Sequence, residues 1–243
     1  MKSPRNDPDA FIARLFPAGH AIDRSSVLSA QIYTVLREGI ITMALRPDDQ
    51  IYERVIADTL GVSRTPIREA LQRLARDELV LIAAQSGTYV APVRREQFVE
   101  SALIRKVLEA AGIRHAAAVI GQRALQELRD IHLAHRRAIE FRDAVAAIAY
   151  DNAFHAKVSA AAQLPKVLSL VELVRAPIDR VRHVTVRDPV VGEVTLRQHE
   201  AILLALERHD PVAAEAALQT HLDDAFERQM AAFERNRAMF EGE

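Results

Sequence analysis

The sequence contains no cysteine, which excludes a disulfide framework and thiolate chemistry. No apolar run approaches the roughly 20 residues that a helix needs to span a bilayer. The first residues, MKSPRNDPDAFIARLF, lack the apolar centre of a signal peptide. Glycine and proline are scarce, with 8 and 10 residues among 243, which favours helix. From these absences we expect a soluble, cytoplasmic, mainly α-helical protein without a membrane segment.

The overall charge offers no sign of a nucleic-acid binder, because 32 basic and 33 acidic residues leave a net charge of −1. The distribution of charge is uneven, however. Residues 1–95 carry a net charge of +2 and residues 96–243 a net charge of −3. Between Arg54 and Arg76, five arginines stand against two acidic residues. The strongest basic segment is therefore short and close to the N-terminus.

The first hundred residues predict a small domain of three helices followed by a hairpin. A helix beginning near Ser26 ends before Pro47, a short second helix spans Glu53–Leu60, and a third follows Ser63. The segments LVLIAA and TYVAPV, separated by QSG, predict two short strands. This order is typical of a winged helix-turn-helix, which we expect over residues 25–93. Residues 1–24 precede it as a flexible arm, with room for one helical turn at Ala10–Phe16.

The third of these helices has two different faces. Ile67, Leu71 and Leu74 recur at helical spacing and face a core, whereas Arg64 and Arg68 lie one turn apart on the other face. A helix-turn-helix inserts this helix into the major groove, where arginine binds guanine edges or phosphate.

Four smaller residues complete the candidate DNA-contacting set. The hydroxyl groups of Ser63 and Thr65 stand at a helix N-terminus, which favours phosphate. Gly87 and Thr88, at the tip of the hairpin, are placed to reach the minor groove or the DNA backbone. The alternative is a solvated basic face on an ordinary three-helix domain.

The run LGVSRTPIREALQRLARDELV, followed by GTYV, resembles the DNA-binding domain of the GntR family of bacterial transcription regulators. The resemblance implies that Arg54, Arg64 and Arg68 contact operator DNA and that Thr65 contacts its backbone. It also implies a homodimer on pseudo-palindromic double-stranded DNA. The sequence departs from the family where glycine is usual, with Met43 and Asp48 flanking the first turn and Glu78 near the end of the third helix.

After Glu96 the sequence reads as helix throughout. We expect six helices, at about 96–118, 122–140, 143–162, 165–184, 194–208 and 211–237, with breaks at glycine and proline. Residues 96–237 therefore predict an all-α domain of six helices, large enough to enclose a cavity.

Four side chains in this region form a candidate metal site. Asp151 and His155 share one helix face at a spacing of four, and His199 and His221 lie on two later helices among apolar neighbours. Imidazole and carboxylate together suit Zn²⁺, Ni²⁺ or Mn²⁺. The alternative is that each histidine is a surface or hydrogen-bonded core residue. His132 and His135 form a rival pair, which we place on the surface.

Residues 96–237 resemble the FCD effector domain that follows this DNA-binding domain in a GntR subgroup. The resemblance rests on Arg105 with Glu109, D-x-x-F-H at 151–155, His199 before an Ile-Leu pair and a final His-Leu at 221–222. It implies that the four candidate residues bind a divalent metal, beside which a small carboxylate effector pairs with Arg105. An asparagine usual in the family is absent, with AAQLPKV in its place.

Two alternatives for the effector site stay open at this point. In one alternative, Arg105 serves only as an ion-pair partner of Glu109 on its own helix; in the other, Arg175 or Arg182, which are weaker candidates, binds the effector.

The sequence therefore predicts a ligand-responsive transcription regulator, more typically a repressor, and not an enzyme. One alternative is a regulator that responds to the metal itself. A metal-dependent hydrolase is less favoured, because Glu200 follows His199 without the second histidine of an H-E-x-x-H motif.

Overall fold

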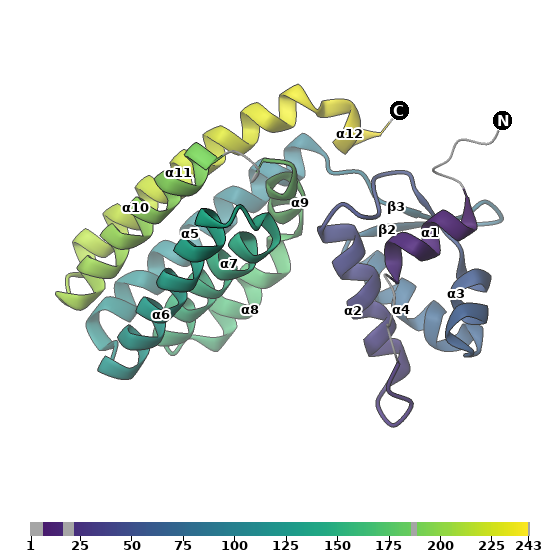
Figure 1. Cartoon of the computed structure of the whole chain (residues 1–243), viewed down its shortest axis with the longest axis horizontal. Coiled ribbons are helices and arrows are strands. Elements are labelled where there is room, and N and C mark those ends of the chain that lie inside the picture. The colour runs from purple at the N-terminus through teal and green to yellow at the C-terminus, as the bar shows by residue number, and fades with distance from the viewer. Residues whose placement is uncertain (1–6, 17–21, 186–188, 243) are drawn as a thin grey trace. The chain divides into compact units, whose positions relative to one another are not determined.

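The computed structural model describes residues 7–16, 22–185 and 189–242, and the chain divides into two compact units. The winged-helix unit comprises residues 1–95 and 236–243, and the bundle unit comprises residues 96–235. Both consist mainly of helices (Figure 1), which confirms the expected fold class. Among the described residues, no helix is both long and apolar enough to cross a membrane.

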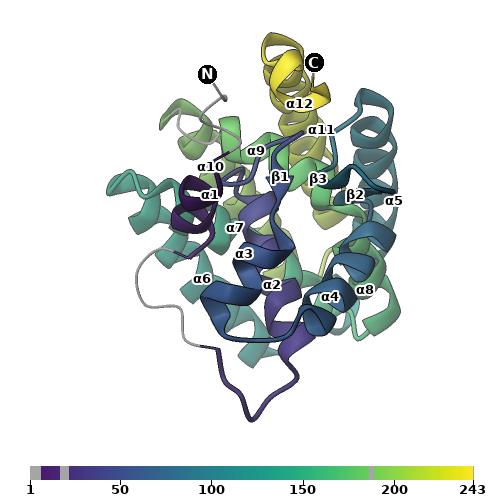
Figure 2. The same ribbon diagram turned by 90° about the vertical axis from the view of Figure 1, so that its right-hand side faces the viewer.

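The winged-helix unit combines short helices with a small antiparallel sheet (Figure 2). The strand order is β1-β3-β2, and β1 pairs with β3 through Gln50–Tyr89 and Ile51–Thr88. The strand β1 was not predicted, because two residues are too short for a periodic pattern. The elements are α1 (Pro8–Leu15), α2 (Leu28–Ile41), β1 (Gln50–Ile51), α3 (Glu53–Leu60), α4 (Arg64–Arg76), β2 (Val80–Ala83), β3 (Gly87–Val90) and α12 (Arg237–Glu241).

The core of this unit explains the two-faced helix. Ile67, Leu71 and Leu74 of α4 are buried, as their spacing predicted. Gly61 ends α3 in the left-handed conformation at φ 62°, and Ser63 precedes α4 in an extended conformation. Ser26 does not cap α2, because its hydroxyl donates to Asp23 instead.

The expected flexible arm is corrected for residues 8–15, which form α1. Phe11 and Leu15 of this helix are buried, and the Phe11 ring packs edge-to-face on Tyr52 at 5.6 Å. Arg14 forms a 2.7 Å ion pair with the buried Asp49. The sequence signal was weak because only two apolar side chains anchor an eight-residue helix. Residues 1–6 and 17–21 of the expected arm lie outside the described residues.

The three positions where the family favours glycine keep a left-handed backbone. The φ angles of Met43, Asp48 and Glu78 are 60°, 64° and 57°. A non-glycine residue in this conformation costs roughly 1–2 kcal/mol. The turns are therefore retained at the expense of local backbone strain.

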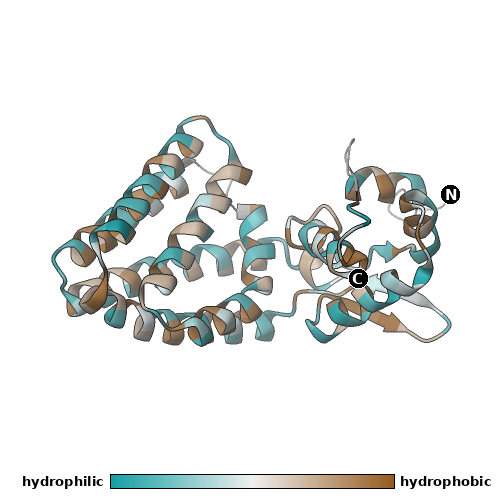
Figure 3. Ribbon diagram, turned by 90° about the horizontal axis from the view of Figure 1, so that it is seen from below, coloured by the Kyte–Doolittle hydropathy of each residue, from teal (hydrophilic) through white to brown (hydrophobic). Residues whose placement is uncertain are grey.

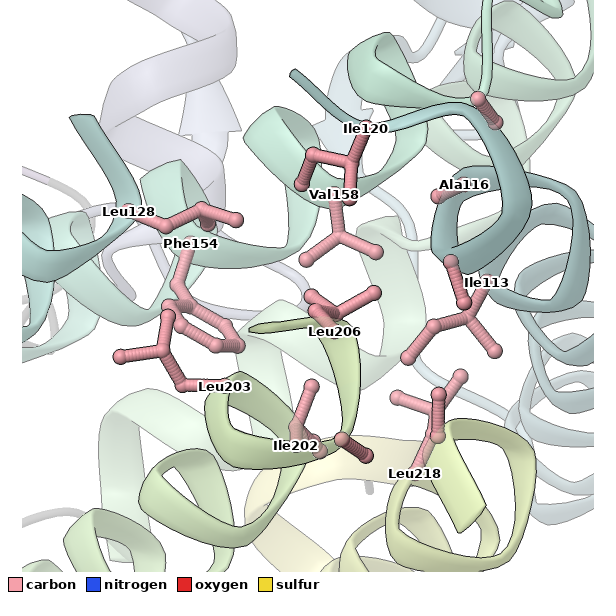
Figure 4. Packing of buried hydrophobic residues seen from close by; sticks show 14 of the residues in the cluster. Ile113, Ala116, Ile120, Leu128, Phe154, Val158, Ile202, Leu203, Leu206 and Leu218 are labelled. Carbon is pink, nitrogen blue, oxygen red and sulfur yellow. The ribbon is translucent and has the colours of Figure 1, made fainter. Parts of the chain in front are cut away.

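The bundle unit is built from seven helices among the described residues. Hydrophilic and hydrophobic residues alternate along them (Figure 3), as expected for helices with one buried face. Leu206 belongs to the apolar core of this unit and is seen below Val158 and above Ile202 in the middle of the view (Figure 4). The helices are α5 (Arg95–Val119), α6 (Gln122–Glu140), α7 (Ala144–Ala161), α8 (Pro165–Val174), α9 (Ala176–Thr185), α10 (Pro189–Glu207) and α11 (Pro211–Arg235).

Three of the predicted helix bounds are corrected. The helix expected at 165–184 is split into α8 and α9, because Pro177 lacks an N–H and fits only in the first turn of a new helix. The helix α10 begins at Pro189 rather than at residue 194. At the C-terminus, α11 ends at Arg235 and residues 236–243 belong to the winged-helix unit.

Candidate metal centre and nucleic-acid interface

The four candidate metal ligands come together inside the bundle unit. Asp151 and His155 lie on α7, His199 on α10 and His221 on α11, and all four are buried. One potential ligand atom from each lies within 4.8 Å of all the others. The Phe154 ring stacks on His199 at 4.2 Å and gives the cluster an apolar wall.

Two imidazole nitrogens, Nε2 of His155 and Nε2 of His221, face each other in this cluster. His155 Nδ1 lies 2.8 Å from Glu109 Oε2, and His221 Nδ1 lies 3.1 Å from Gln198 Oε1. Both oxygens accept, so each Nδ1 donates, and in the neutral form of each ring Nε2 presents a lone pair. The two Nε2 atoms are 3.1 Å apart. Two lone pairs at this distance repel unless a cation lies between them.

The spacing of the ligand atoms fits such an ion. Donors about 2.1 Å from a metal lie about 3.0 Å apart in octahedral and about 3.4 Å apart in tetrahedral geometry. His199 Nε2 is 3.4 Å from Asp151 Oδ1, and His155 Nε2 is 3.8 Å from Asp151 Oδ2. Within the described residues, neither ring nitrogen of the fully buried His199 makes a hydrogen bond. The residues present therefore fit a divalent ion held by three imidazoles and one carboxylate.

Burial and neighbouring charges shift the pKa values of Asp151, His199 and His221 so that these side chains stay in the protonation states that bind metal. Burial raises the pKa of Asp151, but Arg182 and the three histidines outweigh it and hold that pKa well below its usual range. Burial lowers the pKa of His199 well below its usual range and that of His221 to about 3. At neutral pH the cluster therefore offers the anionic carboxylate of Asp151 and the neutral imidazoles of His199 and His221, the forms that bind metal.

Arg105 and Glu109 form the ion pair that the sequence left as an alternative. Arg105 Nε lies 2.6 Å from Glu109 Oε1, and both side chains are buried. Burial raises the pKa of Glu109, but the charges of Arg105 and His155 outweigh it and lower that pKa below its usual range. Among the described residues, Nη2 of Arg105 has no hydrogen-bond partner. Arg105 thus keeps one donor available for an anion.

The two weaker effector candidates make other contacts. Arg182 Nη2 lies 2.5 Å from Asp151 Oδ2 and also donates to Asn152. Arg175 pairs with Asp179 at 3.0 Å and donates to the same Asn152 side chain. Both guanidinium groups are therefore engaged within the bundle unit.

The prediction that His132 and His135 lie on the surface is wrong. Both are buried, since α6 packs against α7 and α10. His132 Nε2 lies 3.0 Å from Glu200 Oε2. The His135 ring is 5.5 Å from that of His199, and burial lowers the pKa of His135 to about 4.

The predicted DNA-contacting arginines project from the winged-helix unit. Arg64 is exposed at the first position of α4. Arg68 is exposed and pairs with Glu53 at 3.1 Å, and Arg54 is exposed beside Asp58 at 3.6 Å. Surface ion pairs of this kind are worth about 1 kcal/mol or less, so phosphates compete with them readily. Ser63 and Thr65 are also exposed.

The candidate contacts at the hairpin need one correction. Thr88 is buried and lies within β3, so its side chain does not reach the surface of the hairpin. The pleat explains this, because alternate residues of the strand face the core. Gly87 opens β3 at φ 125°, and the exposed turn itself comprises residues 84–86.

Two residues important for the site were not identified as such from the sequence. Glu109 was noted only as a partner of Arg105, yet it also holds His155, and Gln198 holds His221. Such supporting contacts orient a ligating imidazole and raise its basicity. The one available signal was position, because Gln198 precedes His199 directly. Nothing in the sequence shows that residue 109 reaches residue 155.

Comparisons with known proteins identify both domains of the chain. Residues 28–90 match the family model described as bacterial regulatory proteins, gntR family, and residues 100–224 match the FCD domain. The chain is 31% identical over 200 residues to the HTH-type transcriptional repressor RspR of Escherichia coli, covering 82% of this chain and 88% of that protein. It is 30% identical over 172 residues to a D-xylose utilization operon transcriptional repressor of Paenarthrobacter nicotinovorans, covering 71% and 75%.

Solved structures show the same fold. The Escherichia coli protein McbR/YncC aligns with a TM-score of 0.75 at 21% identity, over 87% of this chain and 99% of that one. A protein described as a transcriptional regulator GntR from Rhodococcus sp. RHA1 aligns with a TM-score of 0.73 at 25% identity, over 84% and 98%.

Proposed function

The chain belongs to the GntR family of bacterial regulatory proteins and carries an FCD domain, and from this premise we propose a ligand-controlled repressor. It is a DNA-binding transcription regulator and not an enzyme, which removes the hydrolase alternative. In the proposed mechanism, a small carboxylate effector binds beside a divalent metal in the bundle unit and changes the affinity of the winged-helix unit for its operator.

The proposed DNA-reading surface is the exposed face of α4 with the N-terminus of α3. Arg64 and Arg68 enter the major groove, and Arg54 contacts the backbone beside them. Ser63 and Thr65 bind phosphate at the start of α4. The turn after β2 reaches the neighbouring backbone, with Gly87 allowing its close approach.

The observation that carries the metal proposal is the pair of facing Nε2 atoms of His155 and His221 at 3.1 Å. We propose Zn²⁺, Ni²⁺ or Mn²⁺ as the ion, since each accepts imidazole and carboxylate. Four protein ligands leave two positions in octahedral geometry. The oxygens of a carboxylate fit these positions, and Nη2 of Arg105 supplies the matching cation.

The proposed assembly is a homodimer. Exposed apolar side chains occur on α5 at Leu103 and Val107, and on α8 at Leu170 and Leu173. The helices α5 and α8 are neighbours, because the Gly112 position faces Val167. A dimer presents two α4 helices to the two halves of a pseudo-palindrome. We propose repression because similar proteins are repressors by name, and the cytoplasm because the operator lies there.

The direct test is selection of genomic DNA fragments, followed by fluorescence anisotropy on the selected sequence at two salt concentrations. We expect tight, salt-dependent binding that Arg64→Ala/Arg68→Ala abolishes. The matched control is Arg123→Ala/Arg208→Ala, which removes two exposed arginines of the bundle unit. Failure of the wild type to select any preferred sequence would contradict the proposed operator reading.

A further inference from the structure

Residues 236–243 follow the entire bundle unit in sequence, yet they are part of the winged-helix unit. They also lie beyond both segments that match family models, which end at residues 90 and 224. The chain therefore crosses between the units twice, once at residues 95–96 and once at residues 235–236.

Within the winged-helix unit, the C-terminal residues are joined to the segment that leads out of it. The backbone N–H of Val93 donates to the carbonyl of Phe240 at 2.7 Å, and the Phe240 side chain is fully buried. The Glu241 carboxylate accepts from the backbone N–H of Arg95, where α5 begins. Gly242, at φ +79°, approaches the Asp48 carboxylate so closely that a side chain would overlap it.

Within the bundle unit, the same two chain segments are joined again. The Phe98 ring, in the first turn of α5, stacks against Phe226 of α11 at 5.6 Å and against Phe233 at 6.0 Å. Phe98 and Phe233 are both fully buried. The outgoing and the returning segments are thus held side by side on each side of the crossing.

We propose that residues 236–242 form a clasp that restricts rotation of the winged-helix unit about its linker. A single connecting segment allows the two units to rotate about it, because a few backbone dihedral angles absorb large rotations. Two connecting segments held side by side resist this rotation. Bending of the two segments is the motion that remains. The two units consequently change orientation along a defined path rather than at random.

The clasp also connects the proposed metal centre to the winged-helix unit through a helix. This consequence, unlike the clasp itself, rests on the proposed function. His221 and the clasp are connected by one continuous helix, α11. The 14 residues from His221 to Arg235 extend about 21 Å at 1.5 Å per residue. A displacement of α11 at His221 is thereby carried to Arg235, from which the single residue Asn236 leads into α12.

The test measures the spread of orientations in the full chain without DNA, metal or effector. The chain has no cysteine, so Gln72→Cys and Gln122→Cys introduce one exposed spin-label site in each unit. Labelled chain is diluted with unlabelled chain so that one copy per assembly reports. Double electron–electron resonance then gives the distribution of distances between the two labels.

We expect a narrow distance distribution in the wild-type background and a loss of that narrow peak in Phe240→Ala. Phe240→Leu, which keeps an apolar anchor, should restore it, and Ala238→Ser on the exposed side of α12 should leave it unchanged. Amide exchange of α4 shows whether the winged-helix unit of Phe240→Ala stays folded. If it unfolds, Glu241→Gln takes its place and is expected to broaden the peak.

Two results would overturn the clasp. In one, the wild type and the folded clasp variant both give a broad distance distribution. In the other, both give a narrow distance distribution. Neither result depends on operator or metal binding, so failure of the clasp is distinguishable from failure of the proposed function.

Discussion

Replacement of Glu109 by glutamine tests the metal centre without removing a ligand. The carboxylate uses both oxygens, Oε1 with Arg105 Nε at 2.6 Å and Oε2 with His155 Nδ1 at 2.8 Å. An amide of the same shape offers one acceptor oxygen and one NH₂ donor. Whichever way it turns, one of the two N–H donors then faces another donor.

Loss of the contact to His155 frees that ring to carry its proton on Nε2, where a metal cannot bind. Removal of such a supporting contact typically costs 10–100-fold in metal affinity, which corresponds to about 1.4–2.8 kcal/mol. We therefore expect Glu109→Gln to bind Zn²⁺ about 10–100-fold more weakly than the wild type in competition with a chelator.

The matched control is Glu172→Gln, which makes the same chemical change at an exposed position of α8. Its Zn²⁺ affinity should equal that of the wild type. A Glu109→Gln protein with unchanged Zn²⁺ affinity and a folded bundle unit would refute the reasoning, because His155 would then not depend on Glu109 for its orientation.

Three further predictions concern stability, measured by urea unfolding of the metal-free protein. Leu206→Ala in the bundle core should lower the free energy of unfolding by about 2–5 kcal/mol. A loss below about 1 kcal/mol would contradict the burial of Leu206 in this core. Gly61→Ala should lower the free energy of unfolding by about 1–2 kcal/mol because of its positive φ, whereas Gly112→Ala inside α5, where the new Cβ meets Val167 at an ordinary 3.9 Å, should not. The lowered pKa of His135, about 4, and of His221, about 3, means that the unfolded state binds more protons below pH 6.5. Stability should therefore fall as the pH drops from 6.5 towards 4, by up to about 1.4 kcal/mol per pH unit for each group; a flat profile would contradict neutral buried histidines.

The parts of the fold that could be predicted from sequence are those with a repeating local signal. The helix α4 is one example, because its apolar spacing, Gly61 and Ser63 all indicate the same boundaries. The helical turn expected at Ala10–Phe16 overlaps α1, but the full length of α1 and the strand β1 were not predicted, because each is short and is held by contacts distant in sequence, such as Arg14 with Asp49. The return of residues 236–243 to the winged-helix unit is likewise a tertiary contact without a sequence pattern.

In the candidate site, too, some residues could be predicted from a local pattern and others depend on tertiary contacts. Helical spacing placed Asp151 and His155 on one face, and apolar neighbours indicated that His199 and His221 point inward, whereas only the resemblance to a known domain implied that the four residues meet. Local sequence also misplaced His132 and His135, since burial of a histidine depends on which helix covers it. The contacts of Glu109 and Gln198 depend on side-chain directions across helices, which no spacing rule contains.

The central claim is that the bundle unit controls operator affinity. It is tested most directly by the anisotropy of a labelled operator bound to the metal-loaded protein while a panel of small carboxylates is added. We expect at least one carboxylate to release the DNA from the wild type, and none to release it from His155→Ala/His221→Ala, whose operator affinity is otherwise retained. Release by chelation alone would instead identify the metal as the signal. An operator affinity that responds neither to any carboxylate nor to chelation would contradict control by this unit.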